Sequence, residues 1–342
     1  MKNKKSIMAF SALQILFFHL WVNVFAGNEI ELFLRTTAFV GVDIFFFMSG
    51  LSLSSRKVES YLEFELSRFK AVYLKFIIFA IVAAVYSKWT FSRFIRVVTT
   101  VDLFKKGGGA FLWFLPAIMI VYLFYPVFQN YDESIKEKVS PRWGNFISAA
   151  IVVVVWFIVG LLVNNLTDYT AMFIFYNRIP IFVLGYYLGK SELFLKWFGK
   201  NAEEPWVYKL IKGIILTVIG VALVYVFAFR TKLQMPFTDF FYIMVIPLSI
   251  GIALLVSFIP EVKVIKKIGS VTLEMYALQM IFGFKLANKL YNISGSAILT
   301  NIMVFLVIIV AAVIVGMLLT WFVDFIFKKM SLFRGNVKKS ID

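Results

Sequence analysis

Residues 298–327 read ILTNIMVFLVIIVAAVIVGMLLTWFVDFIF, and Asp324 is the only charged side chain in this run. About 20 consecutive apolar residues are enough for a helix to cross the hydrocarbon core of a membrane. The run can therefore span with tilt, or continue past the membrane as an interfacial helix. Other apolar blocks of spanning length lie at 6–26, 37–55, 71–87, 111–128, 146–163, 171–189, 207–228, 239–258 and 270–290.

Composition supports a membrane protein. The 342 residues are 61% hydrophobic and 16% charged, whereas about 25% charged residues is usual in soluble domains. The sequence predicts an all-α polytopic bundle of about ten transmembrane helices. No connecting loop exceeds roughly two dozen residues, fewer than the ~50 of an independent domain. Residues 1–342 are therefore expected to form one transmembrane domain without an appended extracytoplasmic domain.

The distribution of Lys and Arg predicts the orientation. The net charge of +16 is concentrated between the apolar blocks, which favours a membrane orientation signal over nucleic-acid binding. The alternate loops that include both ends of the chain are much more basic than the others, so both termini are expected in the cytoplasm. Block 6–26 follows basic residues as a signal peptide would, but its length indicates a retained first helix. The basic set comprises residues 2–5, 56–75, 136–142, 190–212, 263–267 and 328–339.

His19 is the most informative polar residue inside an apolar block. It is the only histidine, and the chain has no cysteine, which excludes thiol chemistry and a histidine-cluster metal site; no metal is expected. Histidine exchanges a proton near neutral pH, so His19 is a candidate general base. A structural histidine bonded to a neighbouring helix is the alternative. At helical spacing His19 shares one stripe with Met8, Ser11, Ile15 and Asn23.

Three further ionisable residues lie inside apolar blocks, where they usually face a cavity or a partner. Asp43 is expected either to orient His19 or an acceptor hydroxyl, or to cap the start of its helix. Arg178, close to a proline, is expected to line an internal channel or to form an ion pair with an acid on another span. Glu274 is the third such candidate.

A basic segment follows the second block. Its cations suit the phosphates of a nucleotide-containing donor. The alternative is that they face anionic lipid and obey the positive-inside rule. They are Arg56, Lys57, Arg68, Lys70 and Lys75.

Five motifs, in order and nearly end to end, resemble the acyltransferase 3 family of bacterial membrane O-acyltransferases. They are LQILFFH ending at His19, VDIFFFMSG at 42–50, LWFLP at 112–116 with Tyr125-Pro126, RIPIFVLGYYLG at 178–189, and GSVTLEMY at 269–276. The resemblance implies transfer of an acyl group, most often acetyl, from cytoplasmic acyl-CoA to a hydroxyl of a cell-surface saccharide or its lipid-linked precursor. It also implies the bacterial cytoplasmic membrane as location and acyl-CoA as co-substrate, with no permanently bound cofactor.

The chain departs from the family pattern at two positions. The family places an arginine eleven residues before the helix-one histidine, where this chain has Met8. Lys5 lies about 40° round the helix from His19 and can supply the cation; otherwise donor binding rests on Arg56 and Arg68. Gln279 stands where the family often has a second histidine.

These observations predict a site with His19 as general base and Asp43 as its catalytic partner. Lys5, Arg56 and Arg68 are expected to bind the donor. Direct transfer and an acyl-histidine intermediate both remain open, and a transporter or flippase for a lipid-linked saccharide or small anion is the alternative function. The expected acyl and acceptor channel comprises Asn23, Ser49, Trp113, Arg178, Glu274, Tyr276 and Gln279.

Overall fold

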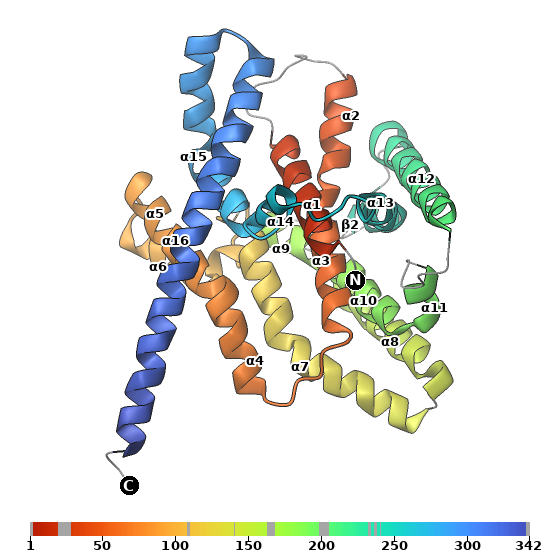
Figure 1. The fold of residues 1–342 in the computed structure, drawn as a ribbon. Coiled ribbons are helices and arrows are strands. Elements are labelled where there is room, and N and C mark those ends of the chain that lie inside the picture. The colour runs from red at the N-terminus through yellow and green to blue at the C-terminus, as the bar shows by residue number, and fades with distance from the viewer. Residues whose placement is uncertain are drawn as a thin grey trace.

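The structure, a computed structural model, is a bundle of helices (Figure 1). It describes residues 3–19, 29–107, 110–139, 141–162, 168–197, 205–231, 234–235, 238–239 and 241–339. The first half contains α1 (Lys4–Phe18), α2 (Glu29–Ala38), α3 (Val40–Leu53), α4 (Tyr61–Arg68), η1 (Phe69–Tyr73), α5 (Leu74–Tyr86), α6 (Phe91–Val98), η2 (Val101–Phe104), α7 (Phe114–Lys138) and α8 (Pro141–Leu162). The second half contains α9 (Thr170–Tyr176), α10 (Ile179–Lys190), α11 (Glu192–Leu195), α12 (Trp206–Leu223), η5 (Val224–Thr231), β1 (Gln234–Met235), β2 (Thr238–Asp239), α13 (Phe241–Val256), α14 (Lys263–Ile268), α15 (Thr272–Ser294) and α16 (Ala297–Lys339).

The all-α polytopic prediction is confirmed. Among the described residues, seven helical segments are long and apolar enough to cross a membrane. The other three predicted spans, at 6–26, 239–258 and 270–290, contain the helices α1, α13 and α15. The count of about ten spans and the cytoplasmic placement of both termini stay predictions. The two strands form one short antiparallel pair in which Gln234 faces Asp239.

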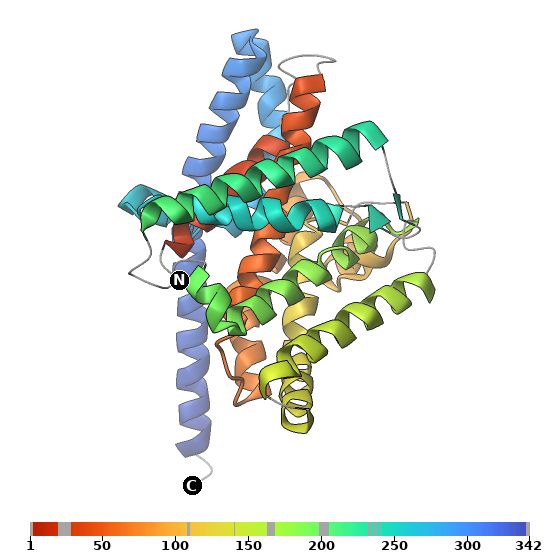
Figure 2. The same ribbon diagram turned by 90° about the vertical axis from the view of Figure 1, so that its right-hand side faces the viewer.

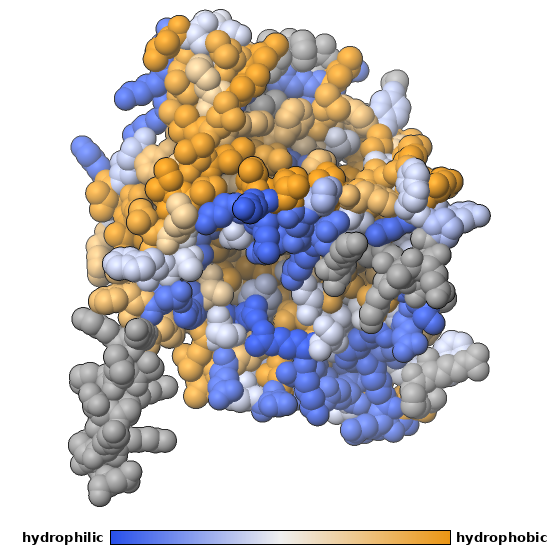
Figure 3. Space-filling view, viewed as in Figure 1, coloured by the Kyte–Doolittle hydropathy of each residue, from blue (hydrophilic) through white to orange (hydrophobic). Residues whose placement is uncertain are grey.

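Burial separates central helices from those that face lipid. The most apolar window of the α2–α3 segment is 72% buried, whereas the windows of α8 and α12 are 17% buried. α3 therefore lies in the core, and α8 and α12 turn most of their apolar side chains outward, as helices in lipid do. Figure 3 shows one face of the molecule, with hydrophobic residues over its upper part and hydrophilic residues gathered below.

α1 lies in the middle of the molecule and packs against α3, α14 and α15 (Figure 1). α12 and α13 run side by side across it, as Figure 2 shows. α3 and α10 pack most closely at Gly50 and Gly185. A Cβ added to Gly50 would meet the backbone of Phe182, and one added to Gly185 would meet the backbone of Phe47. Small residues at such crossings let two transmembrane backbones approach each other.

The predicted span at 171–189 is interrupted. α9 ends at Tyr176 and α10 begins at Ile179, with Pro180 in the first turn of α10. A proline in the first turn costs no hydrogen bond because the N–H it lacks has no intrahelical acceptor there. The interruption places Arg178 at the N-cap of α10, inside the bundle.

Candidate active site

A polar cavity of about 300 Å³ lies where α1, α3, α4 and α7 meet. Three cationic side chains line it: Lys4 from α1, Arg56 from the α3–α4 loop and Arg68 from the end of α4. We call it the cationic cavity. Its other lining residues are Met8, Met48, Ser49, Ser52, Leu53 and Tyr122.

Hydrogen bonds from α7 hold the α3–α4 loop in place. The buried Tyr125 hydroxyl donates to the carbonyl oxygens of Leu53, at 2.7 Å, and of Arg56, at 3.0 Å. The Gln129 side-chain amide donates to the same Arg56 oxygen at 3.0 Å. Because both donors are buried and satisfied, the backbone at Arg56 has a fixed position beside the cavity.

Two guanidinium groups lie against one aromatic ring. The Arg56 and Arg68 guanidinium carbons are 5.2 and 5.1 Å from the centroid of Phe64, and that of Arg68 is also 5.2 Å from the centroid of Tyr122. Such cation–π contacts orient the groups without neutralising them. In the described part of the chain, neither arginine has an acidic side chain at ion-pair distance. The pair therefore favours an anionic ligand.

Lys4, and not Lys5, is the cavity lysine of α1. The Lys4 ammonium donates to the Ser52 hydroxyl at 2.7 Å. Partial burial, and then the nearby cations Lys5 and Arg68, lower the pKa of the Lys4 ammonium. The Lys5 ammonium instead lies 3.4 Å from the Gly269 carbonyl oxygen, and Lys5 does not line the cavity. The structure therefore places Lys4, and not Lys5, in the cationic cavity, and donor binding by Lys5 stays a prediction.

An inner pocket of about 180 Å³ adjoins the cationic cavity and lies between α1, α3, α7 and α15. The inner pocket and the cationic cavity are neighbours, because both are lined by Met8, Ser49 and Tyr122. Tyr276 and Gln279 project to the inner pocket from α15. Gln279 is 2% exposed, and its carbonyl oxygen Oε1 has no hydrogen-bond partner. A buried acceptor without a partner is costly, so this oxygen suits a ligand that donates a hydrogen bond.

One stripe of α1 connects the two spaces with His19. Lys4, Met8 and Ile15 line the cationic cavity or the inner pocket, and His19 follows Ile15 by one turn. The His19 ring nitrogen Nδ1 lies 2.9 Å from the Ile15 carbonyl oxygen. A carbonyl oxygen only accepts, so Nδ1 carries the proton and Nε2 keeps its lone pair in the neutral ring. His19 lies one turn beyond the residues that line the inner pocket.

Asp43 and Arg178 form a buried ion pair. The Arg178 Nε atom is 3.3 Å from Asp43 Oδ1, and the two residues are 7% and 3% exposed. The guanidinium carbon also lies 5.6 Å from the Trp113 ring centroid. The structure therefore brings Asp43, Trp113 and Arg178 together, and it supports the ion-pair alternative for Arg178. Asp43 has no contact with His19 among the described residues, so its expected role in orienting the imidazole is not seen.

Glu274 also has an ion-pair partner. Its carboxylate is 2.6 Å from the Lys75 ammonium, and its side chain is 1% exposed. Glu274 lines neither the cationic cavity nor the inner pocket, unlike Ser49, Tyr276 and Gln279, which all line the inner pocket. The predicted channel residue Asn23 lies outside the described residues.

Sequence reasoning missed several lining residues, among them Lys4 and Tyr122. The signal for Lys4 is its spacing of four residues from Met8, which puts both side chains on one helix face. Tyr122 has no comparable signal, because a single tyrosine in an apolar span is ordinary in membrane proteins.

A family model described as an acyltransferase domain, that of the acyltransferase 3 family, matches residues 8–321. The chain therefore belongs to the acyltransferase 3 family. No curated protein and no solved structure matches the chain.

Proposed function

We propose that this membrane acyltransferase transfers an acyl group, acetyl in the simplest case, from cytoplasmic acyl-CoA to a hydroxyl of a cell-surface saccharide or its lipid-linked precursor. The observation that carries the proposal is that the cationic cavity and the inner pocket share lining residues along one stripe of α1, and His19 lies on the next turn of that stripe. Membership of the acyltransferase 3 family supports the class of reaction.

The cationic cavity suits the phosphates of CoA. In the described structure no acidic side chain lies at ion-pair distance from Arg56 or Arg68, and the Lys4 ammonium donates to the neutral Ser52 hydroxyl. Hydrogen bonds between such cations and phosphate oxygens are short and about twice as strong as neutral ones. In this proposal the nucleotide end of CoA lies at the cytoplasmic mouth, which agrees with the predicted orientation.

The inner pocket suits the thin arm of CoA. The rise of an α-helix is about 1.5 Å per residue, so Lys4 and His19 are roughly 22 Å apart along α1. A ligand that contacts both ends must be long and narrow, as the pantetheine arm is. Ser49 and Gln279 are polar groups on this route, and the unpartnered Gln279 oxygen is an acceptor for an amide N–H of the arm.

His19 has the tautomer that a general base requires. Its Nε2 lone pair accepts the proton of the acceptor hydroxyl while the hydroxyl oxygen attacks the thioester carbonyl carbon. Collapse of the tetrahedral intermediate breaks the carbon–sulfur bond, and the imidazolium returns the proton to the CoA thiolate. The products are the ester and free CoA. The Ile15 carbonyl holds Nδ1–H and stabilises the imidazolium in between.

Asp43, Arg178 and Trp113 act in this proposal as positioning residues. The buried ion pair joins α3 to the start of α10, and the indole covers the guanidinium. Acyl transfer depends mainly on positioning and charge stabilisation, so the pair supports the chamber without touching the reacting atoms.

An assay with acetyl-labelled CoA tests the proposal against transport. Membranes that contain the chain and the saccharide acceptors of the producing cell are incubated with the labelled donor. The expected result is label in a saccharide ester that mild alkali releases, together with stoichiometric free CoA. A transporter or flippase would leave the label in acetyl-CoA, and that result would refute the proposal. A Phe10→Leu variant, altered at an exposed apolar position of α1, is the matched control and should transfer label normally.

A further inference from the structure

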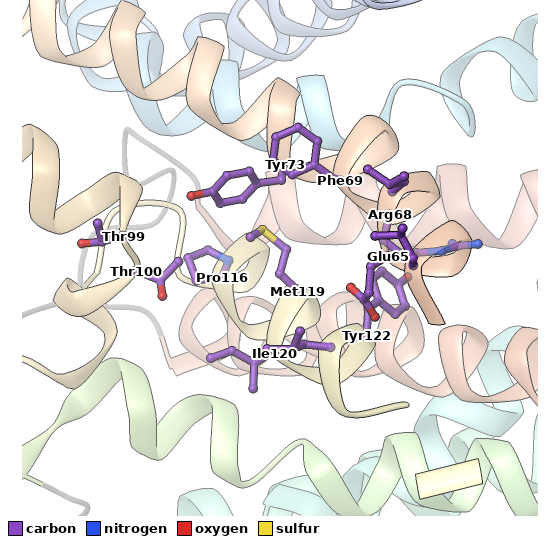
Figure 4. Close-up of a pocket in the computed structure, with 13 residues that line it drawn as sticks. Glu65, Arg68, Phe69, Tyr73, Thr99, Thr100, Pro116, Met119, Ile120 and Tyr122 are labelled. Atoms are coloured by element: carbon purple, nitrogen blue, oxygen red, sulfur yellow. The ribbon is translucent and has the colours of Figure 1, made fainter. Parts of the chain in front are cut away.

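A separate hollow of about 410 Å³ lies between α4, η1 and α7 (Figure 4). Its walls are mostly apolar. Figure 4 shows Met119 in its middle, Thr99 and Thr100 at one end, and Glu65, Arg68 and Tyr122 at the other. We call it the lateral groove, and its apolar walls comprise Leu66, Phe69, Tyr73, Met119, Ile120 and Leu123.

The lateral groove is open toward the bilayer. Leu62 and Leu123 are 65% and 46% exposed, and both line it. They belong to the segments Tyr61–Tyr86 and Phe114–Lys138, which are long and apolar enough to span a membrane. These exposed apolar side chains offer a hydrocarbon chain an apolar edge at which to enter the groove from the lipid.

One end of the groove is cationic. Arg68 lines both the groove and the cationic cavity, and so does Tyr122. The Arg68 Nε atom is buried without a hydrogen-bond partner. Glu65 is the acidic residue at this end, and its buried Oε1 is also without a partner. Lys4 and Arg56 in the adjoining cavity leave the local charge positive.

The π-helix η1 separates the groove from the inner pocket. Phe69 and Tyr73 line the groove, whereas Val72 lines the inner pocket. The Tyr73 hydroxyl donates to the Val98 carbonyl oxygen at 2.9 Å, which ties η1 to the end of α6. π-Helical turns occur frequently at functional sites, because the extra residue per turn redirects side chains. Here the π-helical turn contributes side chains to both the lateral groove and the inner pocket.

We propose that the lateral groove holds one acyl chain of an anionic phospholipid of the cytoplasmic leaflet, with the lipid phosphate on Arg68. The charge at the Arg68 end complements the phosphate, and the apolar length of the groove complements the chain. The acyl chain of the donor does not suit this groove. The groove meets the cationic cavity at Arg68, where the donor phosphates are proposed to bind, whereas the thioester is proposed to lie at the far end of the inner pocket, near Ile15. Lipid and acyl-CoA then share Arg68, so bound lipid weakens donor binding. This second consequence rests on the proposed function, whereas the docking of lipid does not.

Photocrosslinking tests the docking. The full chain is placed in nanodiscs that contain phosphatidylglycerol with a diazirine in one acyl chain, and the labelled peptides are mapped. We expect labels to concentrate on residues 62–73 and 116–123. Met119→Trp, which fills the groove, should remove this concentration, whereas Val127→Trp, at an exposed position on the same helix outside the groove, should keep it. Labels spread evenly over lipid-facing helices such as α8 and α12, or labelling of Met119→Trp that equals wild type, would overturn the proposal.

A second variant tests the headgroup contact. Arg68→Gln removes the charge of the side chain and keeps a hydrogen-bonding amide on a shorter side chain. We expect it to lose the preference for phosphatidylglycerol over a phosphatidylcholine probe with the same diazirine chain. An unchanged preference would show that the phosphate does not lie on Arg68.

Binding of CoA tests the shared cation. In phosphatidylglycerol nanodiscs the wild type should bind CoA about twofold or more weakly than in phosphatidylcholine, since a half-occupied competing site has that effect. The negative surface potential of phosphatidylglycerol repels CoA from the wild type and from Met119→Trp alike. The difference between the two proteins in the change of Kd therefore reports the effect of lipid in the groove alone. Equal shifts would overturn the competition. Absence of CoA binding in every disc would instead contradict the proposed function, with the crosslinking map still deciding the docking.

Discussion

Replacement of Lys4 by methionine removes one of the three cations of the cationic cavity and keeps the apolar length of the side chain. Lys5→Met is a matched control, because it changes the net charge equally at the neighbouring residue. The Lys4 ammonium lies 2.7 Å from Ser52 Oγ inside the cavity, whereas the Lys5 ammonium lies 3.4 Å from the Gly269 carbonyl oxygen outside it. We therefore expect Lys4→Met alone to weaken donor binding.

The size of the effect follows from the exposure of Lys4. A hydrogen bond from a charged group is worth about 1.5–3 kcal/mol when buried. Lys4 is partly exposed, and exposed charge pairs are worth about 0.2–1 kcal/mol, so a contribution of roughly 0.5–1.5 kcal/mol is reasonable here. This corresponds to about a twofold to tenfold increase in the Kd for acyl-CoA, because about 1.4 kcal/mol is a factor of ten.

Isothermal titration of a non-transferable thioether analogue of acetyl-CoA into nanodiscs measures this Kd. The loss in Lys4→Met should shrink as salt rises, because salt screens exposed charges. Equal losses in the two variants, or a larger loss in Lys5→Met, would refute the placement of the donor phosphates in the cationic cavity.

Three further predictions concern the ion pair, the helix crossing and pH. Asp43→Asn should destabilise the fold by about 3–5 kcal/mol because it leaves the Arg178 charge buried without its partner. In thermal unfolding, the double variant with Arg178→Gln should recover part of that stability. A loss in the double variant equal to the sum of the two single losses would contradict the pairing. Gly185→Ala should lower the midpoint of thermal unfolding, since its Cβ meets backbone of α3 and overpacking costs about 1–3 kcal/mol; an unchanged midpoint would show that the helices can separate. The pKa of Lys4 is lowered, so its ammonium should lose its proton at a pH below the pKa of an ordinary lysine, which is near 10.4. Donor affinity should therefore fall as the pH rises through this lower range, and Lys4→Met should lose this dependence. A variant with the pH profile of the wild type would exclude the Lys4 contact.

The sequence predicts the helices well and the contacts between them less well. Hydropathy reports the solvent that a segment faces, so apolar blocks such as 111–128 and 298–327 overlap α7 and α16, although both helices continue beyond the blocks. It carries no information about which helix lies opposite. The pairing of Asp43 with Arg178 depends on the packing of α3 against α10, which follows from close contacts at Gly50 and Gly185.

In the candidate site, too, the sequence predicts some residues and misses the contacts that place others. Arg56 and Arg68 were predicted from their charge and their position after the second block, and both line the cationic cavity. The helical angle to His19 predicts Lys5 as the additional cation, whereas Lys4 lines the cavity. The backbone N–H of Lys5 donates to Glu261 at 2.6 Å, and this tertiary contact, which no spacing rule contains, fixes the start of α1 against the α13–α14 loop.

The most direct test of the account is the separate measurement of transfer rate and donor affinity in His19→Ala. The account predicts that the rate of label transfer falls by about 10²–10⁴-fold, as loss of a positioned general base does, while the Kd of the thioether analogue stays near that of wild type. Transfer at the wild-type rate would contradict the role of the imidazole. Loss of analogue binding together with a normal unfolding midpoint would also contradict it, since His19 would then hold the donor instead of activating the acceptor.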